Sequence, residues 1–170
     1  MRVFTAILIL IVISGCLGIP EGVTPVKDFD INRYLGKWYE IARLDHSFER
    51  GLNNVTAEYS LREDGGINVL NQGFSIENQE WNSAEGRAYF VEEPNKGYLK
   101  VSFFRPFYGS YVIFELDSAY QYAFVCGPDK SYLWLLARSP RIDDKLKNKF
   151  ITTSKNLGFA TDELIFVEHN

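Results

Sequence analysis

The sequence predicts an all-β fold: an eight-stranded antiparallel up-and-down barrel, followed by an α-helix packed outside it. Two observations support this prediction. Most of the chain after residue 28 consists of short runs of alternating apolar and polar residues separated by turn residues, which is the pattern of antiparallel strands. The connections between the runs are mostly short, and eight strands in such a meander can close into a barrel with room for one small ligand.

The strands follow one another along the chain, with turn signals such as Glu63-Asp64-Gly65-Gly66 between them. The expected strands are Trp38–Leu44, Val55–Arg62, Ile67–Phe74, Ala84–Val91, Tyr98–Phe104, Tyr111–Asp117, Tyr120–Cys126 and Tyr132–Arg138. Alternate connections of a meander lie at opposite ends, so the first strand starts and the eighth strand finishes at the same end. This predicts that Trp38 and Arg138 meet there, with the guanidinium over the indole face.

A helix is expected after Ser139-Pro140. Asp143 and Asp144 suit its N-terminus because acidic side chains interact favourably with the helix dipole there, and Gly158 suits its C-terminal end. The positions that recur at helical spacing are Leu146, Phe150, Thr153 and Leu157. A short strand, Glu163–Glu168, is expected to close the chain.

The N-terminus has the composition of an export signal. The apolar run Ala6–Ile13 follows Arg2 and is shorter than the roughly 20 residues that span a membrane, so it predicts a secretory signal. The stretch Ile13-Ser14-Gly15-Cys16 resembles the bacterial lipobox, which implies cleavage before Cys16 and acylation of that cysteine. Leu17 is not the Asp of the inner-membrane retention pattern, which favours the outer membrane. The expected organisation is a signal peptide at 1–15, a lipidated N-terminus and tether at 16–28, and one domain at 29–170.

Composition limits the function. Without Arg2, 17 basic residues stand against 22 acidic ones, and this acidic balance argues against nucleic acid as a partner. It also argues against electrostatic attraction to anionic lipid, so membrane contact is expected through the anchor or through apolar groups. Once Cys16 is lipidated, Cys126 has no intrachain partner, and the domain is expected to fold without a disulfide.

Several motifs resemble those of the lipocalin family. Gly36-Lys37-Trp38-Tyr39 matches the Gly-x-Trp-Tyr motif, and the preceding FDINRYL resembles the short 3₁₀ helix that caps the barrel floor. Arg138 matches the arginine after the eighth strand. The resemblance runs from Val26 to Val167 and is greatest to the bacterial outer-membrane lipoprotein branch, with the apolipoprotein D-like lipocalins more distant. One departure is Leu116-Asp117-Ser118, which stands where many lipocalins carry Thr-Asp-Tyr.

The resemblance implies a carrier of small hydrophobic molecules rather than an enzyme, with no cofactor and no metal. For the bacterial members it implies lysophospholipids or fatty acids as ligands and a role in envelope lipid maintenance. A physical argument agrees with that ligand class. A bilayer is as apolar as a barrel interior, so the barrel competes best for single-chain lipids that already leave membranes easily. The expected location is the outer membrane, lipid-anchored through Cys16 and facing the periplasm, and a homodimer is left open.

Strand parity and the resemblance together give the residues expected to face the ligand. Parity from Trp38 and Arg138 directs Tyr132 and Trp134 inward, and on the second strand it favours the apolar set that runs from Val55 to Leu61. The expected ligand-binding side chains are Tyr59, Val69, Asn71, Ala88, Val101, Phe103, Tyr111, Tyr132 and Trp134, whereas Gly36, Trp38 and Arg138 are expected to be structural residues of the floor.

The sequence leaves the roles of two features open, the Glu40 side chain and a group of aromatic residues. Glu40 shares the parity of Trp38, so it is expected to face inward, either in a structural ion pair or in contact with ligand. Phe104, Phe107 and Tyr108 put an unusual number of aromatic side chains in one connection, and such a patch indicates contact with a lipid surface or a dimer interface.

Two other functions compete with the carrier. The first is a barrel filled by its own side chains that serves as an interaction module of the envelope. The second is an esterase built on Cys126 and His46, since a Cys–His pair can act as a nucleophile. Nothing in the sequence fixes the geometry of that pair.

Overall fold

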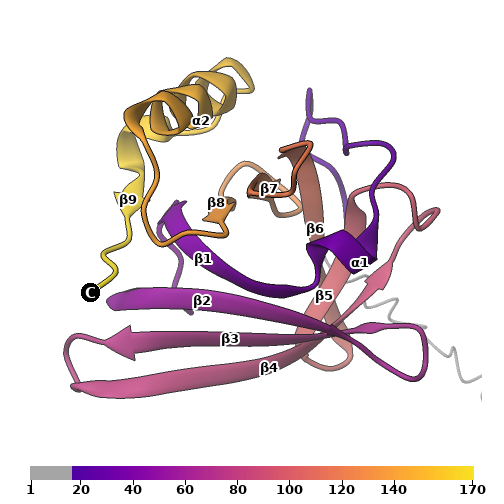
Figure 1. Cartoon of the computed structure of the whole chain (residues 1–170), viewed down its shortest axis with the longest axis horizontal. Helices are drawn as coiled ribbons and strands as arrows, with labels where there is room; N and C mark the ends of the chain where they lie inside the picture. The colour runs from indigo at the N-terminus through magenta and orange to yellow at the C-terminus, as the bar shows by residue number, and fades with distance from the viewer. Residues whose placement is uncertain (1–16) are drawn as a thin grey trace, which may run out of the picture.

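The computed structural model describes residues 17–170, so the expected signal peptide and Cys16 lie outside the described residues. The described chain forms one antiparallel sheet that closes on itself (Figure 1). The elements are α1 (Ile31–Tyr34), β1 (Gly36–Arg43), β2 (Leu52–Leu61), β3 (Ile67–Ser75), β4 (Glu80–Phe90), β5 (Tyr98–Phe104), β6 (Phe107–Leu116), β7 (Tyr122–Cys126), β8 (Leu133–Ala137), α2 (Asp144–Asn156), the 3₁₀ helix η1 (Thr161–Glu163) and β9 (Ile165–Phe166).

The strand order confirms the predicted barrel. Strands β1 to β8 pair in sequence, and β1 pairs with both β2 and β8, which closes the sheet. Four strands start earlier than expected, and the largest differences are at β4, which starts at Glu80, and β6, which starts at Phe107. Both hairpins continue pairing almost to their tips, with Ser75 opposite Glu80 and Phe104 opposite Phe107. These two hairpins lie at the same end of the barrel, because they are alternate connections of the meander.

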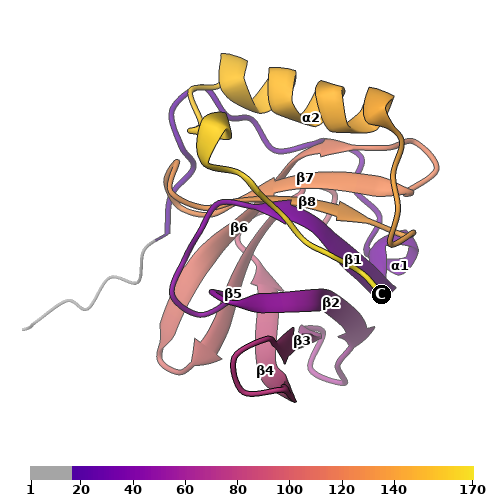
Figure 2. The same cartoon turned by 90° about the vertical axis from the view of Figure 1, so that its left-hand side faces the viewer.

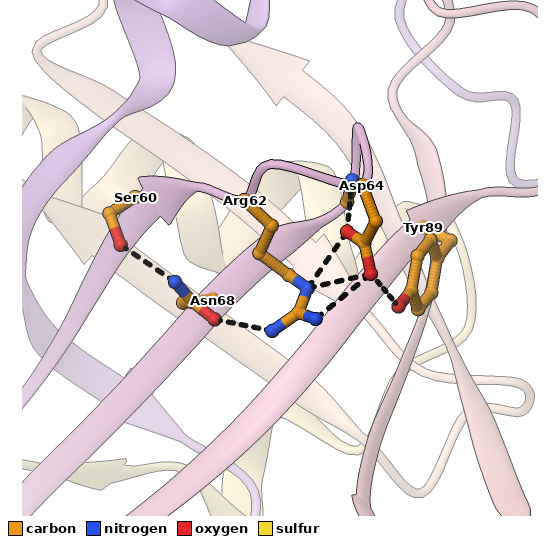
Figure 3. A network of polar contacts seen from close by, with 6 residues as sticks. Ser60, Arg62, Asp64, Asn68 and Tyr89 are labelled. Atoms are coloured by element: carbon orange, nitrogen blue, oxygen red, sulfur yellow. Dashed lines mark hydrogen bonds and ion pairs between the residues drawn. The ribbon is translucent and has the colours of Figure 1, made fainter.

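The β2–β3 turn lies at the opposite end, and a polar network holds it (Figure 3). The Arg62 guanidinium binds the Asp64 carboxylate at 2.9 Å and donates to Asn68 Oδ1 at 2.9 Å, and the Tyr89 hydroxyl donates to Asp64 at 3.2 Å. The Arg62 hydrogen bond in particular lowers the pKa of Asp64 well below its usual value. The network therefore ties β2, β3 and β4 together where the predicted turn occurs.

Short helical turns flank the barrel strands. The expected 3₁₀ cap is wrong in type, because the Leu35 N–H donates to the Ile31 carbonyl at 3.0 Å, which is an α-helical bond. The expected C-terminal strand is also shorter than predicted. Residues 161–163 form η1, and only the two residues of β9 pair with β1, where Phe166 lies opposite Ala42.

Helix α2 lies outside the barrel, over β7 and β8 (Figures 1 and 2). As expected, the Asp143 side chain caps it by accepting from the Leu146 N–H at 2.8 Å, and Gly158 follows it with φ +84°. Its Phe150 is fully buried and meets Phe124 with ring centres 4.9 Å apart. The molecule thus has two apolar cores, an inner one within the barrel and an outer one between α2 and the strands.

The segment expected to be a tether is attached to the barrel. The Gly18 N–H donates to Ser110 Oγ at 2.8 Å, and the Val26 N–H donates to the Ile113 carbonyl at 2.9 Å. The Val23 side chain is buried in the outer core. Residues 17–28, the segment expected to be a tether, therefore pack against the outside of the sheet, where their apolar side chains and backbone groups find partners. Residues 17–170 supply both cores by themselves, and we expect a protein that starts at Leu17 to fold.

Within residues 17–170, no helix is long and apolar enough to cross a membrane.

Candidate functional site

The barrel encloses an open cavity of about 330 Å³, within the range of small-molecule pockets. Its walls are mostly apolar. They come from seven of the eight barrel strands, from α1, and from the segments between β1 and β2 and between β7 and β8. All nine side chains expected from the sequence to bind ligand line this cavity. Leu61, which parity also turned inward, is instead 52% exposed, because β2 continues beyond the cavity toward its turn.

The floor is the predicted contact between the start of β1 and the end of β8. Arg138 lies with its guanidinium carbon 3.9 Å from the centre of the buried Trp38 ring. The same guanidinium donates to the backbone carbonyls of Lys37, Arg33 and Leu35 at 2.8–2.9 Å. It therefore joins β8 to β1 and α1, and it closes the barrel below the cavity.

Gly36 is required at the start of β1. Its φ is +86°, a conformation that strains other residues. A Cβ atom at this position would also stand 3.6 Å from Arg138 Nη1. The motif glycine thus gives the backbone the turn from α1 into the strand, directly beside the guanidinium.

Three tyrosines form a hydrogen-bonded group on the cavity wall. The Tyr111 hydroxyl lies 2.8 Å from the hydroxyls of both Tyr34 and Tyr59. Burial raises the pKa of Tyr111 well above its ordinary value, so the phenol stays protonated. Three hydroxyl hydrogens serve two bonds within the group, which leaves one hydrogen available to a ligand oxygen or to water.

A buried acidic cluster forms another part of the wall. Glu40 and Glu49 both line the cavity and are only 3% and 7% exposed. Arg43 donates to Glu40 Oε1 at 2.7 Å and to the Glu49 backbone carbonyl at 2.8 Å. A β-bulge between Glu40 and Ala42 shifts the register of β1, which puts Arg43 beside Glu40. Glu40 faces inward and pairs with Arg43. This matches one of the two roles that the sequence left open, the structural ion pair.

Aromatic rings surround the Glu49 side of this cluster. Trp134 Nε1 donates to Glu49 Oε2 at 3.1 Å, and His46 Nε2 lies 3.0 Å from the same oxygen. The His46 ring lies 3.9 Å from Phe48, 5.8 Å from Tyr132 and 5.3 Å from Trp134, measured between ring centres. Phe48, Tyr132 and Trp134 also line the cavity. The carboxylate therefore lies at the edge of an aromatic wall.

The two carboxyls titrate differently. Burial first, and then the charge of Glu49, raise the pKa of Glu40 well above its usual value, and Arg43 offsets only part of this. Burial also acts to raise the pKa of Glu49, but the adjacent His46, Trp134 and Arg43 together lower it. The pair therefore binds a proton more readily at Glu40 than at Glu49.

Sequence reasoning did not identify this cluster. It weighed His46 only as a catalytic partner of Cys126, and it assigned no role to Arg43 or Glu49. The bulge hides the signal, because alternation alone directs Arg43 to the opposite face from Glu40. The remaining clue was the spacing of His46 and Glu49 in the segment before β2.

Cys126 lies in the outer core, whereas His46 lies beside Trp134, which packs against the inner core. The Cys126 thiol is buried in the outer core, where burial raises its pKa to about 12. His46 contacts Trp134 on the cavity side. The structure therefore does not bring the proposed Cys–His pair together, and residues 17–170 hold no group of three or more His, Cys, Asp or Glu side chains suited to a metal.

The mouth of the cavity carries exposed apolar groups. Phe48, Phe104 and Phe107 are 59%, 82% and 56% exposed. The β1–β2 and β5–β6 connections that carry them lie on the opposite side from α1 (Figure 2). Ser110 lines the cavity and accepts the Gly18 hydrogen bond. The first described residues of the chain therefore lie beside the mouth.

Comparison with known proteins agrees with this geometry. The family model described as "Lipocalin-like domain" matches residues 29–169. The chain belongs to the lipocalin family. The match includes the floor motif and the barrel strands, so the resemblance inferred from Gly36-Lys37-Trp38-Tyr39 and Arg138 is confirmed at the level of the family.

Several known proteins are similar to this chain over most of its length. The outer membrane lipoprotein Blc of Vibrio cholerae serotype O1 is 61% identical over 169 residues, which cover 99% of both chains. The outer membrane lipoprotein Blc of Escherichia coli K12 is 52% identical over 149 residues, covering 88% of this chain and 84% of the other. Apolipoprotein D of Bos taurus is 31% identical over 170 residues, covering 89% of each chain.

Solved structures share the fold at lower identity. The cockroach allergen Per a 4 superposes with a TM-score of 0.69 at 20% identity, covering 90% of this chain and 96% of its own. Insecticyanin from the tobacco hornworm Manduca sexta gives a TM-score of 0.68 at 21% identity, covering 90% of this chain and 87% of its own. Both agree with the eight-stranded lipocalin barrel.

Proposed function

We propose that this lipocalin is a membrane-anchored protein that binds single-chain lipids, lysophospholipids or fatty acids, and carries or stores them during maintenance of the bacterial envelope. The observation that carries the proposal is the cavity. It is closed at one end by Trp38 and Arg138, open at the other, and mostly apolar between them. Such a space fits one extended apolar chain with its polar end at the mouth.

The energetics favour lipids with one chain. Burying a methylene group gains about 0.8 kcal/mol relative to water, but a bilayer provides the same gain. A two-chain phospholipid therefore has little to gain by leaving its membrane for a cavity of about 330 Å³. A lysophospholipid or a fatty acid leaves the bilayer readily, so the barrel competes well for it.

The N-terminus supports a membrane location. The lipobox-like stretch ends at Cys16, and acylation there would attach the protein to the bilayer. Relatives with 52–61% identity are named outer membrane lipoproteins, which supports an anchored position in the outer membrane. The Gly18 hydrogen bond at the mouth and the exposed Phe104 and Phe107 support an orientation in which the mouth faces that membrane.

The competing module with a filled barrel is disfavoured by the cavity itself. Small side chains such as Ala88 and Gly109 line it, and they leave space where larger residues would fill a core. Contact of the aromatic mouth with a second protomer stays open as an addition to the carrier function.

The proposal is tested by titrating a delipidated protein that starts at Leu17 with palmitate, a palmitoyl lysophospholipid and the corresponding two-chain phospholipid. Trp134 fluorescence is the readout because this ring lines the cavity, with Trp134→Phe as the control for the signal. Saturable one-to-one binding of the single-chain lipids and weaker binding of the two-chain lipid are expected. No binding of any lipid at micromolar concentrations would contradict the carrier function.

A further inference from the structure

The acidic cluster of Glu40, Arg43 and Glu49 contains two carboxyl groups and one guanidinium. Two buried carboxyls face the cavity, and among residues 17–170 the positively charged side chain bound to them is Arg43. The guanidinium pairs with Glu40, and its Nη2 donates to the backbone carbonyls of Glu49 and Leu52, at 2.8 and 3.2 Å. The Glu49 carboxylate is left with the Trp134 N–H and the His46 imidazole.

A buried carboxylate without a full counter-charge is costly. In the cavity as described, protonation of Glu40 can relieve this cost. A ligand that brings a positive charge to the same place would relieve it as well, and both carboxyls could then be ionised. An anionic group would add to the imbalance, because it would enter beside two acidic side chains.

The aromatic side chains beside Glu49 favour the same kind of ligand. Tyr132 and Trp134 line the cavity with ring centres 6.1 Å apart, and Phe48 lies 6.4 Å from Tyr132. Aromatic faces attract organic cations, and the attraction increases when the cation is out of water. The wall thus combines two features of an ammonium site, which are carboxylate charge and aromatic surface.

We propose that Glu40 and Glu49, together with Tyr132 and Trp134, form a subsite for the ammonium group of a zwitterionic headgroup. This inference rests on the proposed lipid-binding function and narrows it to single-chain lipids that carry an amine, such as lysophosphatidylethanolamine. The acyl chain occupies the apolar part of the cavity.

The subsite also has donors and acceptors for the rest of such a ligand. Asn71 Oδ1 is buried and has no hydrogen-bond partner among residues 17–170, and Asn71 lines the cavity. The tyrosine group has one hydroxyl hydrogen to offer. Asn71 Oδ1 can accept from a ligand hydroxyl, and the tyrosine hydrogen can be donated to an ester or phosphate oxygen between the ammonium group and the acyl chain.

The test compares three probes with the same palmitoyl chain in a protein that starts at Leu17. The probes are lysophosphatidylethanolamine, lysophosphatidylglycerol, which has the phosphate but no amine, and palmitate. We expect the lysophosphatidylethanolamine to bind about tenfold more tightly than the lysophosphatidylglycerol, with palmitate also weaker. This comparison needs no variant, so it cannot fail through misfolding.

Two variants then locate the effect. Glu40→Gln and Glu49→Gln keep the shape of each side chain and remove its charge. Each is expected to bring the affinity ratio of the two lysophospholipids close to one, mainly by weakening the amine-bearing lipid. The matched control is Glu58→Gln, an exposed position on β2 that does not line the cavity, and it should leave the ratio unchanged.

The outcomes separate the subsite from the carrier function. Equal binding of all three probes to the unmodified protein would overturn the subsite and leave lipid binding intact. A uniform loss of both lysophospholipids in Glu40→Gln and Glu49→Gln would mean a structural role and would also overturn it. Failure of the unmodified protein to bind any probe would overturn the proposed function itself.

Discussion

The guanidinium of Arg138 covers the indole of Trp38 at 3.9 Å, and the two residues come from β1 and from the end of β8. The contact joins the first and last strands of the barrel. Four backbone carbonyls, those of Arg33, Leu35, Lys37 and Tyr120, accept from the same guanidinium. Loss of the side chain would therefore remove a cation–π contact and several hydrogen bonds together.

Arg138→Ala is therefore expected to lower the free energy of unfolding by about 3 kcal/mol, since the indole loses its cation and the backbone carbonyls lose their donors. Arg138→Lys should recover only part of this, because an ammonium cannot reproduce the planar fork. Urea unfolding measures both. Arg141→Ala, at an exposed position, is the control. A loss no larger than that of the control would contradict the role of Arg138 in closing the floor.

The stability of the protein should depend on pH through Glu40. Because its folded-state pKa is raised by burial and by Glu49, the folded state binds more protons than the unfolded state above pH 4.5, the ordinary value of the group. Stability should therefore fall as the pH rises through that range. Glu40→Gln removes this dependence, so the variant should gain stability relative to the unmodified protein between pH 5 and 8. Thermal melts across this range test the sign, and parallel curves for the two proteins would contradict it.

Filling the cavity should remove binding without unfolding the protein. Ala88 is buried and lines the cavity between Ile67 and Val101, its partners on β3 and β5. Ala88→Leu should lower the affinity for single-chain lipids by at least tenfold, with a change in stability within about 1–3 kcal/mol. Lipid titration and urea unfolding measure the two effects. Ala119→Leu, in the exposed β6–β7 turn, is the control, and unchanged lipid affinity in Ala88→Leu would mean that the ligand lies elsewhere.

Tyr111 is the centre of the tyrosine group. Tyr111→Phe removes the partner of both the Tyr34 and the Tyr59 hydroxyls, so it should cost about 1–3 kcal/mol of stability. Urea unfolding is again the measurement. Tyr108→Phe, at a half-exposed position with no hydrogen bond described for its hydroxyl, should cost much less. Equal effects of the two changes would contradict the importance of the group.

The apolar mouth should hold the protein on lipid. The double change Phe104→Ser with Phe107→Ser is expected to weaken binding of the soluble protein to phospholipid vesicles, measured by co-sedimentation. Leu61→Ser removes a similarly exposed apolar side chain near the floor end and should have little effect. If the double variant instead changes the oligomeric state in light scattering and leaves vesicle binding intact, the mouth is a dimer interface.

The fold and the cavity wall could be predicted from the sequence because both depend on the alternation of apolar and polar residues along the strands. The register of each strand follows from which face is apolar, and the floor contact follows from counting strands. That is why Val69, Ala88 and Val101 were placed correctly on the cavity wall.

Features that depend on local irregularities of the backbone could not be predicted from the sequence. The bulge in β1 reverses the parity on which the placement of Arg43 depends. The fold of the segment that brings His46 and Glu49 under the mouth depends on contacts with distant residues such as Trp134. The attachment of residues 17–28 was missed for the same reason, since it rests on partners such as Ser110 and Ile113.

The Gly18–Ser110 hydrogen bond limits how far a lipidated protein could travel. Only Leu17 separates Cys16 from Gly18 in the sequence. The backbone between an acylated Cys16 and the attachment point at Gly18 would therefore span about 7 Å at full extension. The cavity would then meet lipids of its own bilayer at a high effective concentration, as in an intramolecular encounter. A protein held this closely is suited to exchange with the leaflet that holds it, and delivery to a distant membrane would require a second carrier.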